Sequence, residues 1–134
     1  MLQRTSRHAA ERPCILVLED EPFIALDLQM ALEDEGAQAH IATTCEDAMG
    51  LLGRLHFDGA ILDVNLGGGQ TCEAAAAHLR KHETPFVLHT GDLDRQGEML
   101  RTLNAKVVPK PTPALRVARS LLDLLEETSD GSDS

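Results

Sequence analysis

The segment PCILVLEDEP, residues 13–22, decides the fold of this chain. Its run from Cys14 to Leu18 is continuously apolar and includes two β-branched residues, which is typical of a strand covered on both faces. The run stops at three consecutive acidic residues, and Pro22 then suits the first turn of a helix. A strand, an acidic loop and a helix in this order predict a β-α-β arrangement.

The rest of the chain continues this alternation of strands and helices. We expect four further strands, at residues 38–42, 60–62, 85–89 and 106–108. We expect helices at residues 22–35, 43–55, 71–80, about 94–103 and 113–127, with Thr43 and Glu46 at capping-box spacing and Thr112 capping the last one. Five strands alternating with five helices predict an α/β fold, a doubly wound parallel sheet with helices on both faces.

The 134 residues suffice for one domain. Residues 1–12 are polar without periodicity and predict a flexible N-terminal arm. The domain itself is expected over residues 13–127. Residues 128–134 are rich in Ser, Asp and Gly and predict a disordered acidic tail.

Composition excludes several classes of function. The formal net charge of −10 repels phosphate backbones, and three Phe without Tyr or Trp leave no platform for base stacking. No apolar run approaches the roughly 20 residues of a membrane span. The three cysteines have no paired spacing and predict reduced thiols. We expect a cytoplasmic protein that binds neither nucleic acid nor membrane.

Polar side chains follow four of the five predicted strands. These are Glu19 and Asp20, Asp63, Thr90 and Lys110. Each alone is ordinary, because an acid after a strand is usually solvated, a Thr is usually a cap and a Lys is usually on the surface. In a doubly wound sheet, however, ligands bind beyond the carboxyl ends of the strands. We therefore expect these side chains to converge at one edge.

Their chemistry suits a divalent cation and a phosphoryl group. Clustered carboxylates repel one another, and a set of oxygen ligands at a wet edge suits Mg²⁺. Lys110 could pair with Asp63 and contact a phosphoryl oxygen, while Thr90 supplies a hydroxyl donor. Asp63 then has the character of a nucleophile that forms an acyl phosphate.

Four segments in order resemble the signatures of bacterial two-component response-regulator receiver domains. They are VLEDEP (17–22), ILDVN (61–65), HTG (89–91) and PKP (109–111). The resemblance covers about residues 13–127 and is to the CheY-like, stand-alone single-domain type. It implies a flavodoxin-like fold with strand order 2-1-3-4-5.

The resemblance also implies a role for each acidic residue. Asp63 matches the phosphoacceptor, and Asp20 matches the direct acidic ligand of Mg²⁺. Glu19 matches the acid that acts on the metal largely through water, and Asn65 the residue that offers it a backbone carbonyl.

Thr90 matches the switch hydroxyl of this family. Lys110 matches the family lysine, whose bond to the following proline is often cis. Two positions depart from the pattern, since Val107 stands where an aromatic residue is usual and Asp92 replaces an aromatic found in similar stand-alone receivers. Asp92 is better explained as a helix cap than as a residue that orients water. These departures leave the readout of the switch open.

The implied function is phosphorelay signal transduction. A sensor histidine kinase or a histidine phosphotransfer protein would donate the phosphoryl group, and the chain would catalyse only its own phosphorylation and dephosphorylation. Output would pass to an unknown downstream protein by contact or onward transfer. Leu115 and Leu122 widen the apolar face of the last helix, which indicates either deep burial or a partner surface such as a homodimer.

Other interpretations stay open beside this one. A degenerate receiver would act as a phosphorylation-independent binding module. A phosphatase of the haloacid-dehalogenase type needs a general acid two residues after its aspartate, where this chain has Asn65. A dinucleotide site is excluded because no GxGxxG follows the first strand. His89 is expected to pack at a strand end, and the other five histidines show no metal-ligand spacing.

Overall fold

The computed structural model describes residues 12–91, 101 and 103–133. The strands are β1 (Cys14–Leu18), β2 (Gln38–Ala42), β3 (Gly59–Leu62), β4 (Phe86–Thr90) and β5 (Lys106–Pro109). The helices are α2 (Pro22–Asp34), α3 (Cys45–Arg54), α4 (Glu73–Lys81) and α6 (Ala114–Asp133). None of the described helices is long and apolar enough to cross a membrane.

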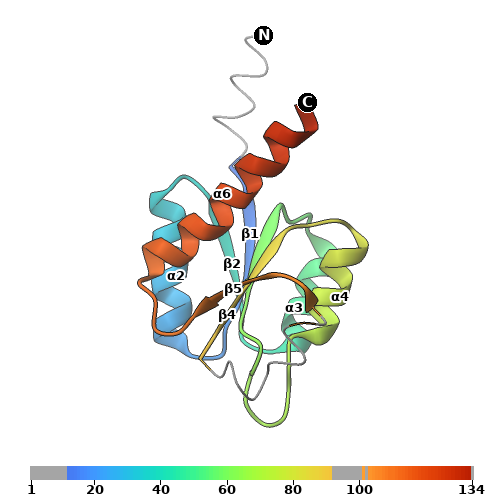
Figure 1. Cartoon of the computed structure of the whole chain (residues 1–134). Helices are drawn as coiled ribbons and strands as arrows, with labels where there is room; N and C mark the ends of the chain where they lie inside the picture. Colours follow the sequence, from blue (N-terminus) through green and yellow to red (C-terminus); the bar gives the residue numbers. More distant parts are fainter. Residues whose placement is uncertain (1–11, 92–100, 102, 134) are drawn as a thin grey trace.

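The five strands form one parallel sheet in the order β2-β1-β3-β4-β5, which confirms the predicted topology. Helices α2 and α6 cover one face, and α3 and α4 cover the other (Figure 1). The register pairs Leu18 with Leu62 and Leu62 with Leu88. Strands β1 and β3 therefore end level with one another, β4 runs two residues further to Thr90, and the loops that follow them meet at one edge.

Alternation along the strands divides the core into two clusters. Leu16, Leu18, Leu62 and Leu88 pack with α3 and α4, and Ile15, Val17, Ile61 and Val87 pack with α2 and α6. All eight side chains are at most 1 % exposed, so each central strand needs apolar residues on both faces. This double burial explains the uninterrupted apolar run at residues 14–18.

The start of α3 corrects the predicted cap. Thr44, not Thr43, is the N-cap residue, and its Oγ1 accepts a hydrogen bond from the backbone N–H of Asp47 at 3.0 Å. Thr43 Oγ1 instead lies 3.4 Å from the Asp47 carboxylate. An N-cap side chain accepts from the backbone N–H three residues later. Thr44 has this spacing to Asp47, and Thr43 has the same spacing to Glu46, so the spacing alone fits both threonines.

The last helix also differs from expectation. Helix α6 runs to Asp133, through residues predicted to form a disordered tail. No proline interrupts this segment, so nothing in it forces the helix to end. At its start, Thr112 Oγ1 donates to the carbonyl of Pro109 at 2.5 Å. The expected arm at residues 1–11 and most of the helix expected at residues 94–103 lie outside the described residues.

Helix α2 carries apolar side chains on its outer face as well as on its inner one. Phe23 is 82 % exposed, Leu26 47 % and Met30 55 %, and their spacing places them along one stripe. Isolated exposed apolar residues are common, but a continuous stripe is characteristic of an interaction surface. This α2 stripe begins two residues after the acidic loop that follows β1.

Candidate functional site

The loops after β1, β3, β4 and β5 enclose a cleft of about 320 Å³ at the carboxyl edge of the sheet. Its lining consists of Asp20, Glu21, Asp63, Asn65, Gly67, Thr90, Gly91 and Lys110. The structure thus brings the predicted site residues together at one place. Glu19 is 1 % exposed and reaches the same site through Lys110.

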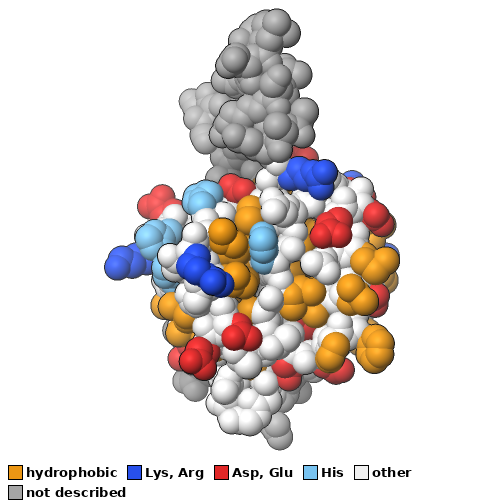
Figure 2. Space-filling model, turned by 180° about the vertical axis from the view of Figure 1, so that it is seen from behind, with side chains coloured by type: hydrophobic (Ala, Val, Ile, Leu, Met, Phe, Trp, Pro, Cys, Tyr) orange, Lys and Arg blue, Asp and Glu red, His pale blue; other side chains and the backbone are white. Residues whose placement is uncertain are grey.

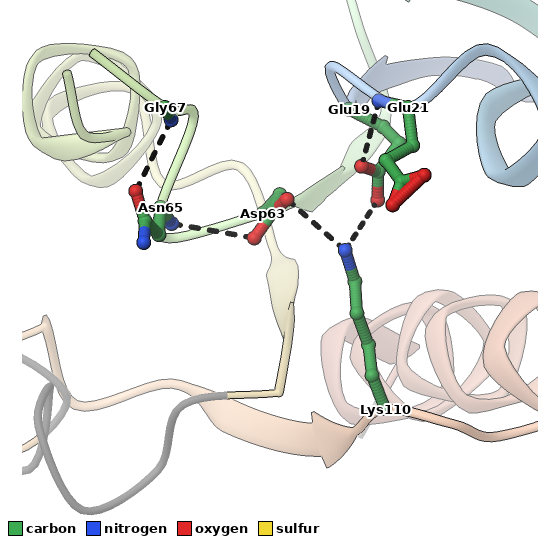
Figure 3. A network of polar contacts seen from close by, with 6 residues as sticks. All are labelled: Glu19, Glu21, Asp63, Asn65, Gly67 and Lys110. Atoms are coloured by element: carbon green, nitrogen blue, oxygen red, sulfur yellow. Dashed lines mark hydrogen bonds and ion pairs between the residues drawn. The ribbon is translucent and has the colours of Figure 1, made fainter. Parts of the chain in front are cut away.

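Lys110 connects the two buried carboxylates. Its Nζ lies 3.1 Å from Asp63 Oδ2 and 3.0 Å from Glu19 Oε1 (Figure 3). The bond from Lys110 to Pro111 is cis, and the backbone N–H of Lys110 donates to the Thr90 carbonyl at 2.9 Å. The predicted pairing with Asp63 is confirmed, whereas the equally short contact with Glu19 was not predicted.

Asp63 is held by backbone groups on both sides. Its own N–H donates to the Leu18 carbonyl at 2.8 Å, and its Oδ1 accepts from the N–H of Asn65 at 3.3 Å. The Asn65 side chain in turn accepts from the N–H of Gly67 at 3.1 Å (Figure 3). These bonds orient the carboxylate toward the cleft with Oδ2 directed at Lys110.

Gly67 is a site residue that the sequence analysis did not single out. Its φ of +81° is in the left-handed region that favours glycine. A Cβ at this position would lie 3.4 Å from Asp20 Oδ2. The run of three glycines after Leu66 was the available signal, because such a run permits a loop to pass close to a carboxylate.

Burial and charge shift the pKa of all three paired groups. Burial raises the pKa of Glu19 to about 7, although its bond to Lys110 opposes this. Burial likewise raises the pKa of Asp63 against the effect of Lys110. For Lys110, burial lowers the pKa, but the two carboxylates outweigh it and the net shift is upward. The ammonium therefore stays charged at neutral pH, while burial disfavours the ionised form of both carboxyl groups.

The acidic residues fit a hard divalent cation. Glu19, Asp20 and Asp63 each offer an oxygen, and these oxygens lie within 4.8 Å of one another. A ligand set made only of oxygens beside an open cleft suits Mg²⁺. Burial raises the pKa of Glu19, and the nearby Asp63 carboxylate adds to that rise. Asn65 lines the same cleft, and its backbone carbonyl as a metal ligand stays a prediction.

Thr90 lies where the resemblance places it, whereas Val107 puts an aliphatic side chain at a position that is usually aromatic in the receiver pattern. Thr90 is 1 % exposed at the end of β4 and lines the cleft. Val107 is half-buried and packs against the core on the α3 and α4 side. His89 is buried, as expected for a packing residue, and burial lowers its pKa to about 4. Asp92 lies outside the described residues.

The raised pKa of Glu19 should be detectable as a pH dependence of the free energy of unfolding. Folded Glu19 keeps its proton between about pH 4.5 and about pH 7, where an unfolded glutamate has lost it. Unfolding then releases a proton, so this group makes the free energy of unfolding fall as pH rises through the window. Replacing Glu19→Gln should remove that loss, and its stability advantage over the wild type should grow across the window by at most about 3 kcal/mol.

The measurement is urea unfolding of both proteins in a chelator at several pH values. Buried His89, whose pKa is lowered, makes the free energy of unfolding rise with pH. This contribution is the same in the wild type and in Glu19→Gln, so it cancels when the two proteins are compared. Excess Mg²⁺ should shrink the advantage, because the cation favours the ionised cluster. A difference that does not vary with pH would contradict this account of Glu19.

Comparison with solved structures identifies the fold. A CheY-like response regulator receiver domain protein from Methanospirillum hungatei JF-1 matches with a TM-score of 0.78 at 19 % identity, over 90 % of this chain and 99 % of that one. The signal receiver domain of a putative Luxo repressor protein from Vibrio parahaemolyticus matches with a TM-score of 0.72 at 22 % identity, over 91 % and 95 %.

A third match is the N-terminal domain of a response regulator/sensory box/GGDEF 3-domain protein from Carboxydothermus hydrogenoformans. Its TM-score is 0.75 at 24 % identity, over 90 % of this chain and 99 % of that one. No protein-family model and no curated protein matches the sequence. The chain has the CheY-like fold of response-regulator receiver domains, with the five-stranded topology that the sequence predicted.

Proposed function

We propose that this chain is a response regulator that accepts a phosphoryl group on Asp63 in a phosphorelay. The observation that carries the proposal is the position of Lys110, whose Nζ lies within 3.1 Å of both Asp63 and Glu19 beside a cleft that Thr90 also lines. A nucleophilic carboxylate, a fixed cation and a hydroxyl thus surround a space large enough for one phosphoryl group.

The chemistry follows from these positions. The Asp63 carboxylate attacks phosphorus of a phosphohistidine, the P–N bond breaks, and the donor imidazole leaves while an acyl phosphate forms. Lys110 balances charge on the transferring oxygens, and the Thr90 hydroxyl donates to one of them. Mg²⁺, held by Glu19, Asp20, Asp63 and the Asn65 carbonyl, would neutralise charge on the phosphoryl oxygens. The chain would act on itself alone and on no separate substrate.

The α2 stripe supports a sensor histidine kinase or a phosphotransfer protein as the donor. Phe23 is the most exposed member and is three residues from Asp20, so a protein that covers the stripe reaches the cleft. Leu115 on α6 is 51 % exposed and Leu122 is half-buried, which leaves room for a downstream partner or a homodimer. All three cysteines are free thiols, which supports a reducing cytoplasmic location.

One observation supports a second candidate function, that of a binding module. Val107 replaces the usual aromatic and is half-buried against the core, so the chain lacks that side chain as a reporter of phosphorylation. A receiver of this kind could serve as a binding module whose contacts do not depend on phosphate. The phosphatase alternative has less support, because Asn65 donates its backbone N–H to Asp63 and carries no acid.

Mass spectrometry of the intact protein tests the proposal. With Mg²⁺ and acetyl phosphate, the chain should gain the mass of one phosphate, and without Mg²⁺ it should gain little, because the acidic cluster then repels the donor. Beryllofluoride should bind only with Mg²⁺. Failure of both reactions in folded protein would favour the binding module. Release of phosphate from general phosphomonoesters would favour the phosphatase.

A further inference from the structure

A second groove lies at the opposite end of the sheet, where α3 and α4 end. Its volume is about 370 Å³, and three histidines, His56, His78 and His82, line it. Histidine side chains gather on this side of the molecule in Figure 2, at the edge that α3 and α4 occupy. Nothing in the proposed phosphoryl chemistry uses these residues.

Two of the histidines form a pair on one helix face. His78 is in the last turn of α4 and His82 is its C-cap, so their spacing of four residues places both side chains on the same side. Their ring centroids are 4.4 Å apart, with the planes inclined by 38°. Two imidazole nitrogens that share a metal each bind it at about 2.0–2.1 Å, so their rings must lie close together, as these two do.

The pair is available for binding. Among the described residues, neither imidazole has a hydrogen bond or an ion pair, and each ring contacts the other. A neutral imidazole has a free lone pair, which is the form that a metal requires.

His56 can supply a third ligand. It lies between α3 and β3, and its side chain is 87 % exposed, so it can turn toward the groove at little cost. Such a turn is needed because the three histidines do not yet have ligand atoms within 4.8 Å of one another. Among the described residues, only Glu19, Asp20 and Asp63 form such a group of three. The Nε2 of His56 is now 3.6 Å from Asp58 Oδ1, a distance too long for a hydrogen bond that would hold the ring in place.

We propose that His78 and His82, completed by His56, form a binding site for a divalent transition-metal ion of the imidazole-binding type, such as Zn²⁺, Ni²⁺ or Cu²⁺. We expected no ligand spacing among these histidines, and the proposal departs from that expectation because His-x₃-His on a helix places two ligands on one face. Arg54 also lines the groove, but it is exposed and can turn into solvent. The proposal does not rest on phosphorylation of Asp63.

Calorimetric titration of the full chain with Ni²⁺ tests the site. Millimolar Mg²⁺ is present throughout to occupy the acidic cleft. One Ni²⁺ should bind per chain, and His78→Gln or His82→Gln should each weaken binding at least about tenfold, since even the loss of an outer-shell partner costs about 10- to 100-fold. His56→Gln should weaken binding as well. The control is His40→Gln, a half-buried histidine outside the groove, which should leave the affinity unchanged.

A second measurement guards against variants that misfold. With Cu²⁺, electron paramagnetic resonance of the wild type should show coupling to imidazole nitrogens, and this coupling should disappear in the His78→Gln/His82→Gln double variant while its circular dichroism stays native. The proposal is overturned if no Ni²⁺ binds, if the single variants keep wild-type affinity, or if His40→Gln lowers affinity as much as they do.

Discussion

Replacing Asp63→Asn should abolish the Mg²⁺-dependent addition of phosphate from acetyl phosphate. The amide that replaces the carboxylate is nearly isosteric and can still accept the hydrogen bond from Asn65, so the cleft keeps its shape. It is nevertheless too weak a nucleophile to attack phosphorus and form an acyl phosphate. Intact-mass spectra of the variant should therefore show no added phosphate under conditions that modify the wild type.

Asp27→Asn is the matched control for this experiment. Asp27 is an exposed aspartate on α2, so the change in charge is the same while the cleft is untouched. This variant should gain phosphate as the wild type does. If Asp63→Asn still gained one phosphate with a normal dependence on Mg²⁺, another residue would be the acceptor and the proposed mechanism would be wrong.

The second large effect is expected from Lys110→Met. The long apolar side chain fills similar space but brings no charge, so the transferring oxygens lose their ammonium partner. Removing one such stabilising donor slows reactions by about 10²–10³-fold, and we expect a loss of that size in the phosphorylation rate. Lys106→Met is the control, because Lys106 is an exposed lysine at the other end of β5 and should not change the rate.

A double variant separates the catalytic part of Lys110 from its structural part. In Lys110→Met, Glu19 and Asp63 stay buried without their cation, so the free energy of unfolding should fall. Adding Glu19→Gln replaces one of the two buried carboxyl groups by a neutral amide and should recover part of that stability but none of the rate. Recovery of the rate together with stability would mean that Lys110 acts only by holding the fold together.

Much of the fold was predictable because its strands are buried on both faces. The apolar runs at β1, β3 and β4 could not be stable at a surface, and the polar residues that end them had to share one edge once the strands were parallel. The placement of Asp63, Thr90 and Lys110 around one cleft follows from those two facts.

The contacts that the sequence left open depend on side-chain direction. Spacing alone predicted the contact of Lys110 with Asp63 but did not show that Lys110 also reaches Glu19, because consecutive residues after a strand point different ways. The histidine groove needed the loop before β3 to lie beside the end of α4, which no local pattern states. The α3 cap at Thr44 was ambiguous because Thr43 precedes it.

The common direction of the five strands has one more consequence. It puts the phosphoryl cleft at the carboxyl ends of the strands and the histidine groove at their amino ends. The two sites are therefore about one strand length apart, roughly 16 Å for five residues. Charges in solution are screened over about 10 Å at 0.1 M salt. The separation exceeds this screening length, so salt in the surrounding solvent should weaken the effect that a charge arriving at Asp63 has on an ion at His78.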